Sequence, residues 1–153
     1  MTQPRGLAEL TRDESLRLLG SVPFGRIVFS HRALPAIRPV NHLVAGDQVI
    51  IRASLGAPVS SAVDGAGAVV AYQADQIDSA SRLGWSVVVV GRARKVGSEM
   101  LAAGYREALR PWIDGDMDEV ISISADLVTG FRMIPGTTGA GCLASPGEEL
   151  PTA

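Results

Sequence analysis

Lysine and cysteine are nearly missing from this chain, and each shortage excludes a class of structure. The 153 residues include one cysteine, Cys142, so no disulfide can form within the chain, and we expect a cytoplasmic location. Lys95 is the only lysine. All other permanently positive side chains are arginines, so a site that requires a lysine at another position cannot be built.

Long apolar runs and blocks of positive charge are also missing. The longest run of branched apolar residues, Val87–Val90, is far too short to cross a bilayer, and the first ten residues contain no apolar segment typical of a signal peptide. The arginines are scattered among 16 acidic residues, and the formal net charge is -2. Membrane insertion, secretion and non-specific binding of nucleic acid are therefore disfavoured.

Motifs that carry chemistry are equally scarce. The two histidines, His31 and His42, are not accompanied by cysteines or clustered carboxylates, so no metal site is predicted. Neither a Gly-x-Ser-x-Gly sequence nor a phosphate-binding Walker sequence occurs. No side chain is identified as a catalytic acid, base or nucleophile.

The sequence does contain repeated runs of β-forming residues, which predict strands over residues 24–30, 36–45, 48–54, 67–75, 85–96, 119–125 and 127–134. Short helices are predicted over residues 12–19, 58–64 and 98–109, the first with a capping box and the second with proline at its first position. Residues 76–84 are expected to form a polar loop, and the valines of Val87–Val90 predict a strand buried on both faces. Because strands and helices do not alternate, we expect a mainly-β fold, an antiparallel closed or split barrel of six or seven strands.

The chain is long enough for one domain with a real core. We expect residues 1–134 to form that domain. Residues 135–153, which include Cys142, are rich in Gly, Pro, Thr and Ala and are expected to be a flexible tail.

Five segments carry a resemblance to a known family: GRIVFS, PAIRPVNHLVAGDQVIIRAS, GWSVVVVGRARKV, RPWIDG and VISISADLVTGFR, in this order. Over residues 10–134 the chain resembles the pyridoxamine 5'-phosphate oxidase-like family of FMN-binding split β-barrels, and it is especially similar to the small actinobacterial-type members. The resemblance implies that FMN is the cofactor. It also implies a homodimer in which each cofactor site lies in the groove between two subunits.

The resemblance places the FMN phosphate in the segment RASLGAPVSSAV, residues 52–63. Here the family usually has an Arg-Thr pair followed by a lysine, whereas this chain has Arg52-Ala53 and Pro58. Arg52 retains a guanidinium group that suits a phosphate, and Ser54 adds a hydroxyl group nearby. The hypothesis is a weakened phosphate site. The alternative is that Arg52 is a solvated strand residue and the segment is a plain connector.

The resemblance places the flavin ring against the segment RPVNHL. Val40 and its backbone are predicted to contact the ring, and Asn41 is predicted to bond its polar edge. Pro39 lacks an N–H group, which in a strand indicates an edge or a bulge and leaves neighbouring backbone groups free for a ligand. Arg38 could meet the phosphate or, across the dimer interface, an acidic side chain.

For the three remaining residues, Trp85, Ser86 and His42, a role in cofactor binding competes with a structural role. Trp85 and Ser86 begin the long strand where the family approaches the flavin, but a tryptophan there is explained equally well by packing. His42 is predicted to be a packed or hydrogen-bonded residue, with haem ligation as the alternative.

These features predict a flavin (FMN)-dependent oxidoreductase that acts on an unidentified small molecule. Oxidation of pyridoxamine 5'-phosphate itself is disfavoured, because the family uses an arginine-rich C-terminal segment and this chain has only Arg132 there. One alternative is a deazaflavin-dependent reductase of the same fold, with Arg26, Arg38 and Arg52 facing the acidic cofactor tail. The other is a non-catalytic, stress-associated protein that binds flavin or haem.

Overall fold

The computed structural model describes residues 5–54, 57–110 and 119–136. Within these ranges the strands are β1 (Arg5–Glu9), β2 (Phe24–His31), β3 (Leu34–Ala45), β4 (Gln48–Ala53), β5 (Ala68–Asp78), β6 (Leu83–Lys95), β7 (Glu119–Ser124) and β8 (Leu127–Pro135). The helices are α1 (Arg12–Gly20), α2 (Pro58–Ala62) and α3 (Glu99–Ala108). Most of the predicted tail, with Cys142, and most of the RPWIDG segment lie outside the described residues.

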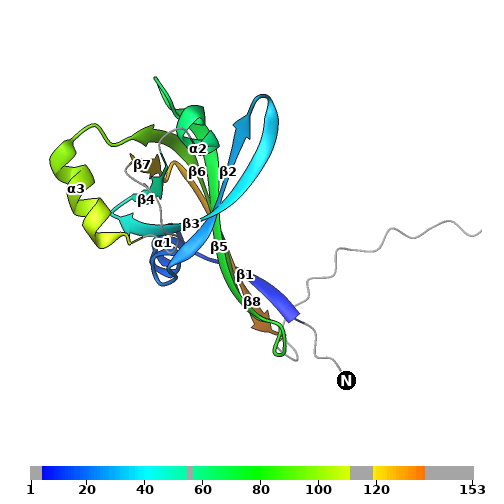
Figure 1. The fold of residues 1–153 in the computed structure, drawn as a ribbon. Helices are drawn as coiled ribbons and strands as arrows, with labels where there is room; N and C mark the ends of the chain where they lie inside the picture. Colours follow the sequence, from blue (N-terminus) through cyan, green and yellow to red (C-terminus); the bar gives the residue numbers. More distant parts are fainter. Residues whose placement is uncertain (1–4, 55–56, 111–118, 137–153) are drawn as a thin grey trace, which may run out of the picture.

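Six of the strands close into an antiparallel barrel. The order around it is β6-β5-β2-β3-β4-β7, and the barrel closes because β6 pairs with β7 as well as with β5. The first part of β6 pairs with β8, which in turn pairs with β1, so these two strands extend the sheet away from the barrel (Figure 1). The predicted mainly-β split barrel is confirmed.

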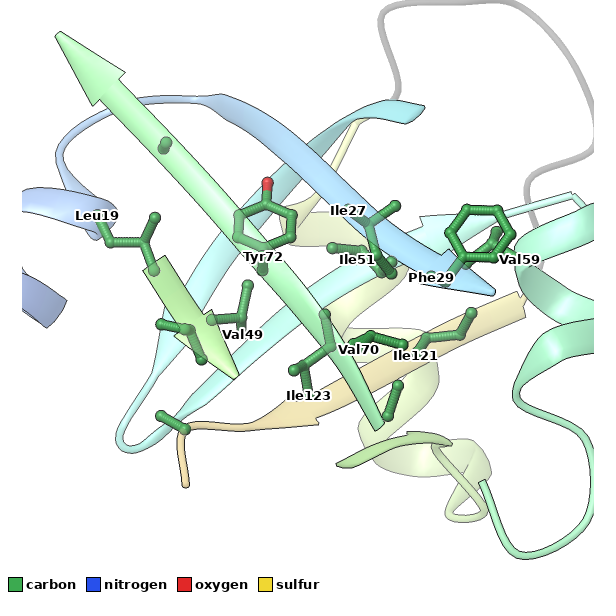
Figure 2. Close-up of a cluster of buried hydrophobic side chains, with 14 of the residues drawn as sticks. Leu19, Ile27, Phe29, Val49, Ile51, Val59, Val70, Tyr72, Ile121 and Ile123 are labelled. Atoms are coloured by element: carbon green, nitrogen blue, oxygen red, sulfur yellow. The ribbon is translucent and has the colours of Figure 1, made fainter. Parts of the chain in front are cut away.

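The barrel interior holds the main core. Alternate side chains of the strands point inward, as the pleat requires, and α1 adds Leu19 at one end. Figure 2 shows much of this cluster, including Leu19, Ile27, Phe29, Val49, Ile51, Val59, Val70, Tyr72, Ile121 and Ile123. A smaller cluster lies on the outer surface, where α3 places Ala102 against Ile50 of β4 and Val120 of β7.

The helices begin where the sequence indicated. Thr11 and Glu14 form the predicted capping box at the start of α1, with the Glu14 amide donating to Thr11 Oγ1 at 3.2 Å. Pro58 is the first residue of α2. In the part of the chain that the structure describes, no helix combines the length and apolarity needed to cross a membrane.

At the extension, one prediction about the strands is wrong and one strand was missed. The segment predicted as a loop over 76–84 is mostly strand, because β5 continues to Asp78 and β6 begins at Leu83. Asp78 accepts bonds from the Ala80 and Ser81 amides, which form the tight turn between them. β1 was not predicted either. These strand ends lie beyond the barrel core, so they lack the apolar alternation that reveals a strand.

The four valines of β6 are not buried on both faces as predicted. Val87 and Val89 are fully buried inside the barrel. Val88 and Val90 point to the outer face and are only half-buried. The run therefore has one face in the core and an apolar outer face that this chain alone does not cover.

Candidate functional site

A pocket of about 150 Å³ lies where β3 and β4 separate beside α2. Its lining consists of Arg38, Pro39, Val40, Arg52, Ala53, Ser54, Ala57, Pro58 and Val59. The structure thus brings together seven of the ten predicted cofactor-binding residues, from both the predicted ring segment and the predicted phosphate segment. Ala57 and Val59 were not predicted, although they flank Pro58 in the same segment.

The pocket exists because β3 has one unpaired side at this point. Pro39 is opposite Arg26 of β2, in a register that continues without a break. On its other side, β3 begins to pair with β4 only at His42, which is opposite Ile51. Pro39 therefore lies at an edge, one of the two predicted situations, and the register shows no bulge. Among the described strands, residues 38–41 pair only with β2.

Arg38 is the cation at the mouth of this pocket. It is opposite Ile27, so it leaves β3 on the same face as the barrel core. Its side chain is exposed, and Nη1 donates to the Ile37 carbonyl at 2.8 Å. Among the described residues, no carboxylate forms an ion pair with Arg38.

Arg52 leaves β4 in a different direction. It is opposite Val120, on the face that α3 covers. Its Nη1 donates to the carbonyls of Arg106 and Leu109, both at 3.0 Å. These carbonyls belong to the last turn of α3, where backbone acceptors lack helical partners and a positive charge is favourable. Arg52 is therefore a half-buried helix cap, and its description as a solvated strand residue is wrong.

His42 and Tyr72 form a hydrogen-bonded pair inside the barrel. His42 Nε2 lies 2.7 Å from the Leu19 carbonyl, and Nδ1 lies 2.5 Å from the Tyr72 hydroxyl. The two rings meet edge to face with centroids 5.0 Å apart. Burial lowers the pKa of His42, against the bond to Leu19, which raises it. Burial raises the pKa of Tyr72, so the phenol stays protonated.

This pairing decides between the two interpretations of His42. Because both ring nitrogens contact protein groups, neither has a free lone pair for a haem iron, and haem ligation through His42 is not supported. Within the described ranges, no three metal-ligating side chains are grouped together. The sequence did not identify Tyr72, whose only signal was an aromatic residue at an inward position of a strand.

The remaining predicted site residues lie outside the pocket lining. Asn41 is on the outer face opposite Phe24, and its Nδ2 is 3.5 Å from the Pro23 carbonyl. Trp85 is only 4% exposed and belongs to the core, so packing explains it and it offers no face to a flavin in this chain. Ser86 is on the outer face of β6 between Asp75 and Phe131.

Lys95 cannot replace the lysine that is missing from the phosphate segment. Its Nζ lies 2.5 Å from Asp64 Oδ1 and 3.0 Å from Glu119 Oε1, and these bonds raise its pKa. Ser60 of α2 donates to the same Glu119 carboxylate. A second hollow of about 180 Å³ lies beside this network, under α3. Its charges are already paired with one another, including Arg106 with Glu99.

Comparison with known proteins gives consistent matches. The family described as pyridoxamine 5'-phosphate oxidase matches residues 11–133. The uncharacterized protein Rv0080 of Mycobacterium tuberculosis is 51% identical over 133 residues, which are 85% of this chain and 88% of that protein. A candidate pyridoxamine 5'-phosphate oxidase of Corynebacterium glutamicum is 26% identical, with a TM-score of 0.68 over 86% of this chain and 96% of its own. An FAD binding protein of Mycobacterium smegmatis is 28% identical, with a TM-score of 0.64 over 83% of this chain and 98% of its own.

Proposed function

Because the chain belongs to the pyridoxamine 5'-phosphate oxidase family, we propose that it binds a flavin nucleotide in the pocket between β3, β4 and α2. A flavin needs an apolar wall for its ring and cationic donors for its phosphate. Pro39, Val40 and Val59 supply apolar surface, and Arg38 supplies the cation. The observation that carries the proposal is that Arg38 and this apolar surface share one pocket. The likeness to the M. smegmatis FAD binding protein supports it.

We assign the phosphate to Arg38 and the hydroxyl of Ser54. Both line the pocket, and Arg38 has no carboxylate partner among the described residues, so its charge is available. A guanidinium group can form two parallel bonds to a phosphate. Arg52 also lines the pocket, but its Nη1 is committed to α3. With this assignment FMN remains the proposed cofactor, and FAD is the second flavin whose binding should be tested.

A bound flavin would supply electron or hydride transfer, and we propose that this protein is an oxidoreductase acting on a small molecule. The chain's own contribution is to bind and orient the cofactor, because the described residues that line the pocket include no carboxylate, histidine or cysteine to act as an acid or base. The deazaflavin alternative is less well supported. Arg26 lies on the outer face, and Arg52, although it lines the pocket, donates its Nη1 to α3, so the three arginines do not act together on one acidic tail.

Removing the charge of Arg38 tests the cofactor assignment. We expect Arg38→Gln to weaken FMN binding by roughly 10- to 100-fold, because a charge-assisted bond to the phosphate is lost. Titration of purified protein with FMN, followed by flavin fluorescence, measures the affinity. Riboflavin, which lacks the phosphate, should bind the variant and the unaltered protein equally.

Arg17→Gln is the matched control, because Arg17 is an exposed arginine on α1 that is not among the residues lining the pocket. Its FMN affinity should stay within about threefold of that of the unaltered protein. The assignment to Arg38 is rejected if both variants bind FMN as the unaltered chain does. The proposed function itself is rejected if the unaltered protein takes up neither FMN nor FAD.

We further propose that the protein is a homodimer whose second subunit completes the site. The pocket is well below the several hundred Å³ that nucleotide sites enclose, so one chain holds only part of the cofactor. An apolar row also crosses the outer face of five neighbouring strands, in register: Ile37, Val28, Ala71, Val90 and Leu127. Ile37 is 56% exposed and Leu127 60% exposed, so the row ends in solvent unless a second copy covers it.

A charge in this row tests the dimer. We expect Ile37→Glu to convert the protein to monomers, because the interface would bury an unpaired carboxylate. Leu101→Glu is a closely matched control, since Leu101 is also 56% exposed but lies on α3. Gel filtration with light scattering measures the mass of each. A monomeric unaltered protein, or an Ile37→Glu variant that remains dimeric, would contradict this interface.

A further inference from the structure

The Tyr72 side chain reaches from β5 across β2 toward β3. Tyr72 is opposite Ile27 of β2, and Gly25, two residues earlier on β2, is opposite Val40 of β3. A Cβ atom at Gly25 would lie 2.8 Å from the Tyr72 hydroxyl oxygen, so only glycine leaves room for the phenol. The hydroxyl ends 3.2 Å from the Val40 carbonyl oxygen. Figure 2 shows the Tyr72 ring within the core cluster.

The donor and the acceptor can be assigned in each hydrogen bond among Leu19, His42 and Tyr72. The Leu19 carbonyl can only accept, so His42 Nε2 carries the proton and donates to it at 2.7 Å. In the neutral ring Nδ1 then has a lone pair, and it accepts from the Tyr72 hydroxyl at 2.5 Å. The hydroxyl has one hydrogen, so His42 Nδ1 takes the stronger arm of a shared bond and the Val40 carbonyl takes the weaker arm at 3.2 Å. His42 therefore sets the orientation of the phenol.

The Val40 segment needs such a contact, because residues 38–41 of β3 pair only with β2 and not with β4. Val40 also lines the pocket. We propose that Tyr72 is a positioning residue of the cofactor pocket: its hydroxyl, oriented by His42, holds the β3 backbone at Val40 from the core side. The inference rests on the proposed function, because the positioned wall is the one assigned to the flavin ring.

The variant Tyr72→Phe keeps the ring and removes only the hydroxyl group. We expect it to weaken binding of both FMN and FAD by roughly three- to tenfold, the equivalent of one neutral hydrogen bond. The carbonyl ¹³C resonance of Val40 should move in the same variant without any ligand. Ile123→Val is the control, because it trims a fully buried side chain on β7 and leaves both resonance and affinity unchanged.

The outcomes separate this inference from the proposed function. If the unaltered protein binds neither flavin, the proposed function fails and takes the inference with it. If it binds flavin and Tyr72→Phe binds equally well, only the inference is overturned. Should that variant fail to fold, the protein is labelled with 3-fluorotyrosine, since Tyr72 and Tyr105 are its only tyrosines. FMN should then shift the ¹⁹F signal of Tyr72 but not that of Tyr105 on α3, and an unmoved Tyr72 signal overturns the inference.

Discussion

Replacing Gly91 by alanine is expected to prevent the barrel from closing. The added Cβ atom would lie 1.6 Å from the Ser124 carbonyl oxygen and 2.8 Å from its carbonyl carbon. Both are backbone atoms, so no side-chain rotation can relieve the clash. We expect a loss of about 4 kcal/mol or more in the free energy of unfolding, which would leave the variant largely unfolded or insoluble. Thermal unfolding followed by circular dichroism, together with the soluble yield, tests this.

The position of Gly91 explains why the effect should be so large. β6 makes its last pair with β8 at Val90 and its first pair with β7 at Ala93. The connection between β7 and β8 therefore crosses β6 beside Gly91. A shift there would disturb the pairing between β6 and β7, which closes the ring of six strands.

Gly104→Ala is the control for a glycine with open surroundings. Gly104 lies inside α3, and nothing would contact an added Cβ atom within 4 Å. Alanine there should raise stability by about 0.5 to 1 kcal/mol, because glycine is the weaker helix former. A Gly91→Ala protein that melts within a few degrees of the unaltered one would contradict the close approach of Gly91 to the Ser124 carbonyl group.

The fold class could be predicted from the sequence because the barrel strands can be recognised from local patterns of apolar residues. Apolar residues on β2 and β4, the Thr11 capping box and the proline of α2 are local features, and each was read correctly. β1 and the outer ends of β5 and β6 were missed because they extend beyond the core and show no apolar periodicity. The close approach at Gly91 joins residues far apart in the chain, so no local pattern reveals it.

The candidate site was likewise predicted only in part from the sequence. The resemblance placed the Arg38 and Arg52 segments in one site, and the structure shows that they share a pocket. The direction of the Arg52 side chain depends on the register between β4 and β7 and on where α3 packs, and neither is a local property. The contact between Tyr72 and His42 likewise joins two strands, 30 residues apart in the chain, that are separated in the sheet by β2.

Replacing Arg52 by glutamine is expected to destabilise the fold while leaving cofactor binding nearly intact. The guanidinium group gives two hydrogen bonds to the last turn of α3, and both are charge-assisted. Their loss should cost about 2 to 3 kcal/mol in the free energy of unfolding, because two charge-assisted hydrogen bonds to the end of α3 are removed. Urea unfolding measures the stability, and FMN titration of the folded variant should give an affinity within about threefold of the unaltered protein.

Comparison with Arg38→Gln distinguishes the two roles considered for Arg52, which are capping of α3 and binding of the cofactor phosphate. Arg38→Gln should change FMN affinity but not stability, so the two arginines are expected to give mirror-image outcomes. Arg52→Lys sharpens the comparison, because an ammonium group keeps the charge near the pocket but cannot reproduce the planar arrangement of guanidinium donors at α3. If Arg52→Gln instead loses tenfold or more in FMN affinity at unchanged stability, the guanidinium group serves the cofactor phosphate. Capping of α3 would then be secondary, and RASLGAPVSSAV would be the phosphate segment that the family resemblance implies.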